Sequence, residues 1–303
     1  MATKRRTVRR RAAAPAARYA YSPIVDRKPV ALPGGARVAV WTIVNVEEWD
    51  ITGPLPRTVL PLPGGGATIP DVTNYGWYDY GLRVGFWRLK DVLDRHGVRA
   101  AMAVNGSICH SYPRLIQAAR DSRWEIVGHG FVQRPLPLER DERTAIRRTV
   151  ETIRAATGAA PRGWLSPGLA ETWRTLDLLA EEGLEYVADW ANDDQPYEMR
   201  VTRGSLVAVP YSLEVNDIPI FLAQHHPAEE LFRRTRDQFD VLYEEGRTNA
   251  RVLPIAVHPY ITGVPHRIKY FEMIYEYLRG KEGVLFWTGA EIVDWFRRVQ
   301  RAP

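Results

Sequence analysis

The sequence predicts a single-domain α/β fold, a (β/α) barrel of about seven parallel strands. Three observations predict it. Short apolar runs alternate with helical patterns along the chain, the first run is apolar almost throughout, and polar or titratable residues follow strand after strand. The 303 residues are 45% hydrophobic and 25% charged, which is typical of a globular protein, and barrels of this size are routinely one domain.

The first predicted strand covers residues 37–44, where a nearly unbroken apolar run is typical of a strand that is covered on both faces. Residues 53–71 are rich in Pro and Gly and include Pro63-Gly64-Gly65-Gly66, which predicts a long loop. Long loops inside compact domains are usually functional or disordered.

The remaining elements follow from runs of β-forming residues and from apolar residues at helical spacing. Strands are expected at residues 100–104, 124–127, 163–165, 186–188, 206–209, 252–257 and 284–286. Helices are expected from about residue 84 to the terminator Gly97, and then at 115–120, 141–157, 172–182, 228–245, 270–278 and 290–298.

The positive charge of the chain is concentrated at its start. The formal net charge is +5, and six cations lie between Lys4 and Arg11, so the rest of the chain sums to about −1. A basic face that would bind nucleic acid is therefore not expected. We expect residues 1–35 to form a disordered or extended basic segment and residues 36–303 to form the catalytic domain.

Three features of the sequence bear on where in the cell the protein is expected to be found. The alanine-rich stretch after the arginines is too short and too weakly apolar for a signal-peptide core, and no later apolar run approaches the ~18 residues that span a membrane. Cys109 is the only cysteine, which excludes an internal disulfide and suits a reducing compartment. We expect a cytoplasmic protein that contacts no membrane.

Three stretches at predicted strand ends carry the chemistry. They are Asn45-Val46-Glu47-Glu48, Gly128-His129-Gly130 and Val257-His258-Pro259. A parallel barrel brings all its strand ends to one face, so two carboxylates and two imidazoles should meet there. Such a set can activate a water and protonate a leaving nitrogen, which indicates a hydrolase.

These stretches, taken in order with Ser166-Pro167-Gly168 and Ala188-Asp189-Trp190, resemble the polysaccharide deacetylase family, also called the NodB homology domain. The resemblance covers roughly residues 36–299 and implies a distorted barrel. Two further stretches, residues 80–88 and 210–217, are similar to the branch of metal-independent allantoinases and related cyclic imide hydrolases.

The resemblance also implies roles for single residues. The family's first motif holds a general base followed by a metal ligand, and Glu47 and Glu48 occupy these positions. Its second motif normally has two histidines four residues apart, whereas this chain has His129 and then Gln133. Glutamine is a poor zinc ligand. We therefore expect no cofactor, with a divalent metal such as zinc on Glu48 and His129 as the alternative.

The expected reaction is hydrolysis of a C–N bond other than a peptide bond, in a small cyclic amide or imide. Glu47 or Glu48 would be the base, with a pKa raised by its carboxylate neighbour, His129 would orient water or substrate, and His258 would be the acid. Backbone N–H groups near residues 166–168 would stabilise the oxyanion. Substrate contacts are expected from residues after the strands, from tryptophans and from a helix start: Asn45, Trp49, Gln133, Ser166, Trp190, Asp193, Tyr211, Asn216, His266 and Arg267.

Two alternatives stay open. One is a metal-dependent deacetylase of N-acetyl carbohydrates, such as peptidoglycan or chito-oligosaccharides. The other is a non-catalytic carbohydrate-binding protein on the same fold, although binding alone needs no acid/base set. We also expect a homo-oligomer, since many enzymes of this size form symmetric assemblies.

Overall fold

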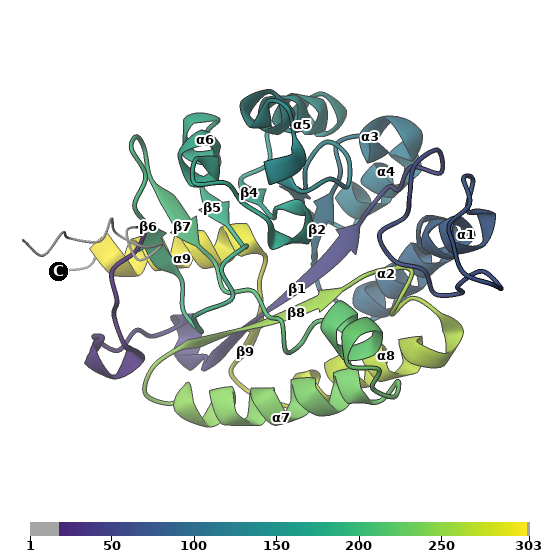
Figure 1. Cartoon of the computed structure of the whole chain (residues 1–303). Coiled ribbons are helices and arrows are strands. Elements are labelled where there is room, and N and C mark those ends of the chain that lie inside the picture. The colour runs from purple at the N-terminus through teal and green to yellow at the C-terminus, as the bar shows by residue number, and fades with distance from the viewer. Residues whose placement is uncertain (1–17, 302–303) are drawn as a thin grey trace, which may run out of the picture.

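Strand β1 (Val38–Val46) is the centre of the sheet and is buried along its whole length. The structure, a computed structural model, describes residues 18–301. On one side β1 pairs with β8 (Arg251–Val257), and on the other with β9 (Val284–Phe286) and then β2 (Ala101–Val104). All three neighbours are parallel to β1, so its carboxyl end shares one rim with the ends of β2 and β8 (Figure 1).

The other strands extend the sheet away from β1 in the order β2, β3, β4, β5, β7 and β6. Only β6 runs antiparallel to its neighbour. The described sheet therefore has seven parallel strands from β7 to β8, with β9 added beside β1, and the predicted α/β fold is confirmed. The additional strands are β3 (Glu125–Gly128), β4 (Gly163–Trp164), β5 (Tyr186–Val187), β6 (Tyr197–Met199) and β7 (Leu206–Ala208).

The sheet curls into a barrel but leaves a seam between β8 and the β6–β7 pair. Instead of a full ladder, isolated contacts span the seam: an isolated bridge between Asn216 and Ala256, and bonds from Asp194 and Gln195. The amide of Val252 donates to the Asp194 carbonyl at 2.9 Å, and the Gln195 side chain donates to the Ala250 carbonyl at 2.8 Å. This open seam gives the barrel its distorted form.

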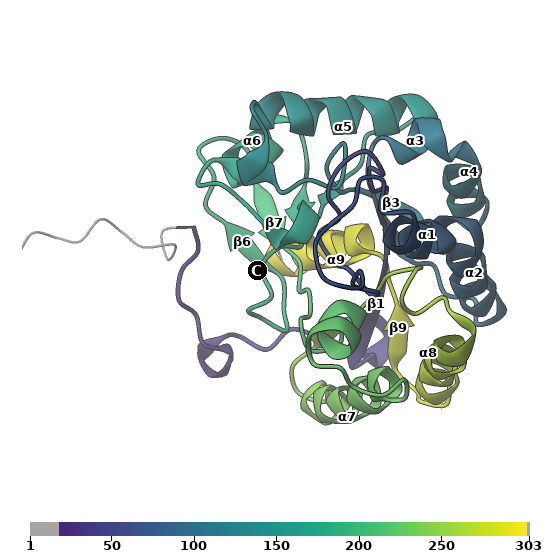
Figure 2. The same ribbon diagram turned by 45° about the vertical axis from the view of Figure 1, so that its right-hand side comes forward.

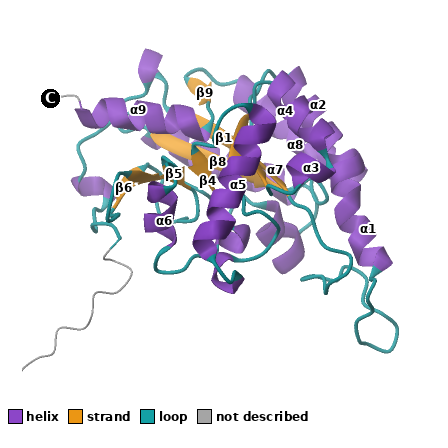
Figure 3. Cartoon of the chain, turned by 90° about the horizontal axis from the view of Figure 1, so that it is seen from above, coloured by secondary structure: helices purple, strands orange, loops and turns teal. Residues whose placement is uncertain are grey.

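Helices cover the outside of the sheet, and one helix closes its amino end (Figures 1 and 3). Helix α9 closes that end, where its Ala290 amide donates to Glu125 at the start of β3 at 3.0 Å. The described helices are α1 (Val72–Tyr80), α2 (Phe86–Arg95), α3 (Ile108–Ser111), α4 (Pro113–Asp121), α5 (Glu142–Thr157), α6 (Thr175–Glu181), α7 (Glu230–Glu245), α8 (Pro265–Arg279) and α9 (Gly289–Arg301).

Alternating side chains of each strand face the barrel interior or the helices. In β1, Ala39, Trp41 and Ile43 belong to the interior cluster, whereas Val40 and Val44 pack outward against helices. The same alternation holds in the other long strand, β8, where Val252 and Ala256 face inward. Because successive residues of a strand point to opposite faces, this register fixes which residues beyond each strand end face the barrel mouth.

Several elements differ from the predicted ones. Strand β6 and helices α1 and α3 were not predicted, since three- to nine-residue elements carry too little periodic signal. Helix α8 begins at Pro265 rather than at residue 270, with the proline in the first turn, where its missing N–H is not needed. The predicted long loop is present and runs up to Asp71, which caps α1.

The segment before β1 lies along the body of the protein. Arg27 forms an ion pair with Asp193 at 2.5 Å, and Val30 accepts from the Ala250 amide at 2.8 Å. The basic run between Lys4 and Arg11 lies outside the described residues. Among residues 18–301, no helix has both the length and the apolar character needed to cross a membrane.

Two glycines let the turn after β8 approach the start of α2. A methyl group on Gly85 would lie 2.0 Å from the carbonyl oxygen of Pro259, and one on Gly263 would lie 2.5 Å from the Cα of Gly85. Both neighbours are backbone atoms, so neither can move aside as a flexible side chain could. The turn that begins at His258 is thereby fixed against the π-helix Gly81–Gly85.

We predict that Gly85→Ala destabilises the protein by about 2 kcal/mol or more, because the new methyl group must displace the turn that carries His258. Gly76→Ala is the matched control, since Gly76 lies in α1 with open space around it and the substitution should be neutral or stabilising there. Urea unfolding of both variants measures the difference. Equal stability of the two would show that this approach does not constrain the turn.

Candidate active site

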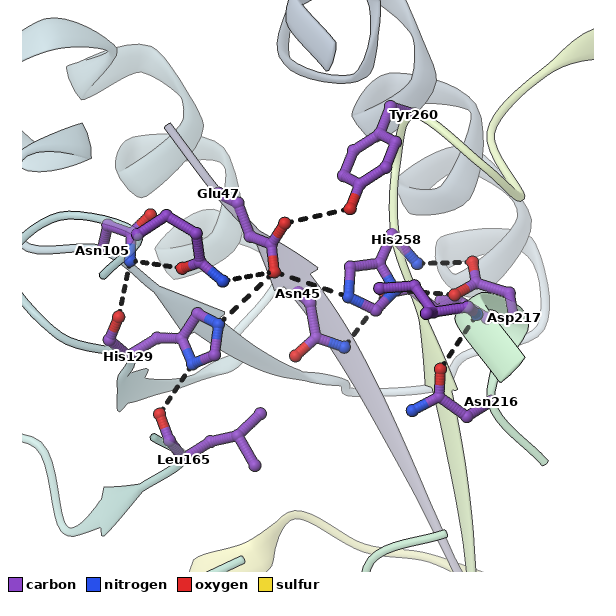
Figure 4. Close-up of polar contacts among 12 residues, drawn as sticks. Asn45, Glu47, Asn105, His129, Leu165, Asn216, Asp217, His258 and Tyr260 are labelled. Atoms are coloured by element: carbon purple, nitrogen blue, oxygen red, sulfur yellow. Dashed lines mark hydrogen bonds and ion pairs between the residues drawn. The ribbon is translucent and has the colours of Figure 1, made fainter. Parts of the chain in front are cut away.

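Glu47, His129 and His258 meet at the mouth of the barrel (Figure 4). The Oε1 atom of Glu47 lies 3.5 Å from Nε2 of His129 and 3.6 Å from Nε2 of His258. The three residues follow β1, β3 and β8, and each continues the inward-facing register of its strand. All three are buried, with exposed fractions of 5%, 3% and 4%. We refer to them as the trio.

Both oxygens of the Glu47 carboxylate accept hydrogen bonds. Gln133 donates its Nε2 to Oε1 at 2.8 Å, and the Tyr260 hydroxyl donates to Oε2 at 3.0 Å. Burial and the negative charge of Glu47 raise the pKa of Tyr260 well above its ordinary value, so the phenol keeps its proton. Gln133 is itself held by Asn105, whose Nδ2 donates to Oε1 of Gln133 at 3.0 Å.

His258 is oriented by Asp217, which is fully buried. The ring Nδ1 lies 2.6 Å from Oδ1 of Asp217, and the backbone amide of His258 donates to Oδ2 at 2.7 Å. Thr262 also donates to Oδ2, at 2.6 Å. Because the carboxylate accepts the Nδ1 proton, Nε2 is the ring nitrogen that faces Glu47 and any bound substrate.

His129 is oriented by a backbone carbonyl instead of a carboxylate. Its Nδ1 lies 2.6 Å from the carbonyl oxygen of Leu165, which can only accept, so Nδ1 carries a proton. Its Nε2 is buried and, within residues 18–301, has no hydrogen-bond partner. That nitrogen is therefore left to contact a water or a substrate beside Glu47.

The charges of the trio move two pKa values in opposite directions. Burial alone would raise the pKa of Glu47, but the positive charge of His258 and the close contacts with both histidines outweigh it and hold that pKa far below its usual range. Burial alone would lower the pKa of His258, but Asp217 and Glu47 raise it to about 9. At neutral pH the pair is a carboxylate beside an imidazolium.

The expectation that a neighbouring carboxylate raises the pKa of Glu47 is wrong, because the groups that contact Glu47 are imidazoles. Glu48 is the next residue and is half-buried. Its backbone amide donates to Asn105 at 2.9 Å, while its Oε2 is buried and, in the described part of the chain, has no partner. The alternation of β1 explains this difference, since Glu47 has the inward register of Trp41 and Glu48 does not.

The residues present do not fit a catalytic metal. Within residues 18–301, no three His, Cys, Asp or Glu side chains are grouped so that they could hold an ion. Gln133 takes the place of the second motif histidine, and both ends of its amide are already bonded, to Glu47 and to Asn105.

Three more of the expected residues lie beneath the trio. The Nδ2 atoms of Asn45 and Asn216 both donate to the Tyr211 hydroxyl, at 3.4 Å and 3.3 Å. Asn45 also donates to the carbonyl of Val257, the residue before His258. These three side chains are buried, so they support the floor of the mouth.

Other expected contacts are placed differently. Asp193 pairs with Arg27 and Trp190 packs on Tyr19, so both contact the segment before β1. The Ser166 amide donates to Asp189 at 2.6 Å, so it cannot also donate to an oxyanion. The expectation that this amide stabilises the oxyanion is therefore wrong. Residue 167 is a proline and has no N–H to offer.

The last expected substrate contacts are His266 and Arg267, at the start of α8, and Trp49, which follows β1. His266 is exposed at the start of α8. Arg267 lies 4.5 Å from the Phe221 ring centroid and donates to the Ile261 carbonyl at 3.2 Å. Trp49 packs on Tyr78, 4.8 Å between ring centroids, and Tyr78 packs in turn on Tyr260.

Sequence reasoning placed no role on three residues of this arrangement: Asp217, Tyr260 and Asn105. Each was visible as a neighbour of a quoted motif, because Asp217 follows Asn216, Tyr260 follows His258-Pro259, and Asn105 directly follows β2. Asn105 also continues the inward register of Ala101 and Ala103. Counting register along β2 therefore places the Asn105 side chain at the barrel mouth.

The half-barrel with the trio at its carboxyl rim is similar to structures of polysaccharide deacetylases. A family model described as polysaccharide deacetylase matches residues 71–187. A putative polysaccharide deacetylase of Schizosaccharomyces pombe is 28% identical over 89% of this chain and 92% of its own length. The chain is thus similar to polysaccharide deacetylases, both in residues 71–187 and along most of its length.

Solved structures are similar over nearly the whole chain. A probable polysaccharide deacetylase from Pseudomonas aeruginosa PAO1 has a TM-score of 0.82 and 26% identity, covering 94% of this chain and 100% of its own. The structure of PuuE allantoinase has a TM-score of 0.81 and 24% identity, covering 94% and 99%. The allantoinase structure shows that the fold is shared. The Pseudomonas aeruginosa structure has the same fold and carries the same description as the matching family model.

We predict that His258 titrates near pH 9 in the free protein, because Asp217 and Glu47 stabilise its charged form. It should be protonated below that pH and lose its proton as the pH rises through it. Asp217→Asn removes one of the two negative neighbours and should lower the titration midpoint by about one pH unit or more. NMR titration of the histidine ring signals measures both.

The matched control is Asp237→Asn, which removes a carboxylate that pairs with Arg236 on the surface of α7. This variant should leave the His258 midpoint where it is. A midpoint for His258 near the ordinary value of ~6.5 in the unaltered protein would contradict the described ion pair.

Proposed function

We propose that this protein hydrolyses a C–N bond in a small cyclic amide or imide by general acid/base catalysis without a metal. The observation that carries the proposal is the opposition of a hydrogen-bonded carboxylate, Glu47, and a carboxylate-backed imidazolium, His258, in one buried site. Such a pair supplies both proton transfers that amide hydrolysis needs.

In the proposed reaction a water attacks the ring carbonyl carbon. Glu47 takes one proton from the water as the new C–O bond forms, and His258 gives its Nε2 proton to the ring nitrogen as the C–N bond breaks. The ring opens to one product that carries a carboxyl group and an amine or amide. Solvent then returns the proton from Glu47 to His258, which restores the starting state.

The two transfers support each other electrostatically. The positive charge of His258 is a main reason why the pKa of Glu47 is low, so Glu47 is a weak base before the reaction begins. Once His258 has given its proton to the leaving nitrogen, that positive charge is gone. Glu47 then holds its newly acquired proton more firmly, so departure of the nitrogen and capture of the proton are coupled.

His129 has a supporting role in this proposal. Its Nδ1 is fixed on Leu165, and its Nε2 faces the trio with no other partner in the described residues. We assign Nε2 to orient the attacking water beside Glu47. A nitrogen with one free position in a buried site holds a water more firmly than an exposed one, because solvent does not compete.

Enclosure of the site favours a small substrate over a polymer. No member of the trio is more than 5% exposed, so a substrate must be taken in whole rather than laid across an open groove. A ring amide or imide has a carbonyl that is attacked more easily than an unstrained acetamide, which suits a site whose residues do not fit a metal. These observations favour the allantoinase-like branch as the source of the substrate class.

Deacetylation of an N-acetyl carbohydrate is the second candidate. It is favoured by the names of the relatives, since the Schizosaccharomyces pombe and Pseudomonas aeruginosa proteins are both described as polysaccharide deacetylases. Hydrolysis of an acetamide uses the same acid and base. Carbohydrate binding without catalysis is the third candidate, and the acid/base arrangement of Glu47, His258 and Asp217 argues against it.

We predict that the purified protein opens succinimide-like rings or allantoin, and that incubation with a chelator followed by dialysis leaves the rate unchanged within about twofold. The expectation rests on a donor set that does not fit a metal. Ring-opening assays before and after chelation, with elemental analysis, make the measurement. Acetate release from chito-oligosaccharides that the chelator abolishes would instead establish the second candidate.

We predict that Glu47→Gln and His258→Ala each lower kcat by about 100-fold or more, because each removes one of the two proton-transfer groups. Glu151→Gln on the exposed face of α5 is the matched control and should keep full activity. Steady-state kinetics on the best ring substrate compare them. Near-normal turnover in either trio variant would remove that residue from the mechanism.

A further inference from the structure

The loop between β1 and α1, residues 49–71, covers the barrel mouth. In Figure 2 it crosses in front of the carboxyl end of β1. The trio beneath is at most 5% exposed, so a substrate cannot reach Glu47 while every surrounding segment keeps its described position. Some part of the cover must move during a catalytic cycle.

One buried side chain, Asn74, holds this loop. Its Oδ1 accepts from the backbone amides of Val59 and Leu60, at 2.7 Å and 3.1 Å, and its Nδ2 donates to the Leu60 carbonyl at 3.1 Å. Nδ2 also donates to Asp71, the residue that caps α1, at 2.8 Å. Asn74 therefore uses both ends of its amide to fix residues 59–60 to the helix.

The loop has few other attachments near residues 57–60. The Tyr78 hydroxyl, one turn along α1 from Asn74, donates to the Arg57 carbonyl at a long 3.4 Å. The side chains of Val59 and Leu60 are 54% and 61% exposed, so they bury little apolar surface. A segment held mainly by a few hydrogen bonds to one side chain opens at low cost, because each such bond contributes little net free energy.

The other end of the loop is coupled to the catalytic carboxylate. Trp49 packs on Tyr78, Tyr78 packs on Tyr260 at 4.9 Å between ring centroids, and the Tyr260 hydroxyl donates to Glu47. Helix α1 thus contacts both the segment that covers the mouth and the aromatic cluster beside the base. Helix α1 therefore helps to hold both the loop, through Asn74, and Glu47, through Tyr78 and Tyr260.

We propose that residues 50–70 are a lid over the site and that Asn74 is its latch. The lid opens as a unit when the bonds from Asn74 to residues 59–60 break while the barrel stays folded, admits the substrate, and closes to exclude water. This inference depends on the proposed function only for the identity of the substrate that the lid admits. The role of Asn74 is tested on the protein alone, with no substrate present.

The test is hydrogen exchange, read by NMR at the Val59 and Leu60 amides, in the unaltered protein, Asn74→Ala and Asn192→Ala. Asn192 is a loop residue that accepts from Tyr197 at 2.7 Å, which makes its truncation a matched control. Asn74→Ala should speed exchange at residues 59–60 about tenfold or more and leave the amides of β1 unchanged. Asn192→Ala should change neither set.

Two results would overturn the latch. One is equal exchange at Val59 and Leu60 in the unaltered protein and in Asn74→Ala. The other is exchange of these amides only through global unfolding, at the rate of the β1 amides. If Asn74→Ala does not fold, Tyr78→Phe replaces it, since this variant keeps the ring contacts and should free the Arg57 end with a smaller increase.

Trypsin gives a second readout, because Arg57 is the only lysine or arginine between Arg37 and Arg83. Cleavage after Arg57 should be faster in Asn74→Ala, and unchanged cleavage would contradict the lid. Saturating succinimide should then slow both exchange and cleavage in Glu47→Gln. If the substrate-free results hold and succinimide has no effect, the lid stands and the ring substrate is wrong.

Discussion

A buried negative charge on Glu47 is the constraint around which the site is organised. An ionised carboxylate taken out of water costs several kcal/mol unless other groups compensate for it. Here compensation comes from an imidazolium, a second imidazole, an amide and a phenol, and these groups come from two segments, one after β3 and one after β8. The strand ends must stay in register for this compensation to hold, which ties the chemistry to the sheet.

A second buried carboxylate, Asp217, makes the arrangement work as an acid. Burial opposes the charged form of His258, and Asp217 together with Glu47 outweighs it and raises the pKa of His258 to about 9, so the site holds a proton donor. Thr262 and the His258 amide also donate to Asp217. With the His258 ring, three groups therefore compensate its negative charge. The acid and the base therefore depend on each other: His258 is charged because Glu47 and Asp217 are, and Glu47 stays charged because His258 is.

Much of this could be predicted from the sequence, for one physical reason. Parallel strands deliver their ends to one rim, and side chains alternate between two faces, so Glu47, His129 and His258 converge once the inward register is known. Asp217 was harder to predict because it lies nine residues beyond the end of β7, past an irregular stretch with no period. The placement of Asp193 depended on the path of Arg27, which carries no local signal. The lowered pKa of Glu47 needed the distances to both imidazoles.

The seam between β8 and the β6–β7 pair has a consequence of its own. In a fully closed barrel, strand number and stagger set the diameter, and widening the mouth breaks ladder hydrogen bonds. Here the gap is bridged by isolated contacts, from Asp194 and Gln195 at one end and from the Val215 carbonyl, which accepts from the Ala256 amide at 3.0 Å, nearer the mouth. This second bridge lies next to Asp217, which orients His258, so the width of the barrel on this side and the position of the His258 ring are linked.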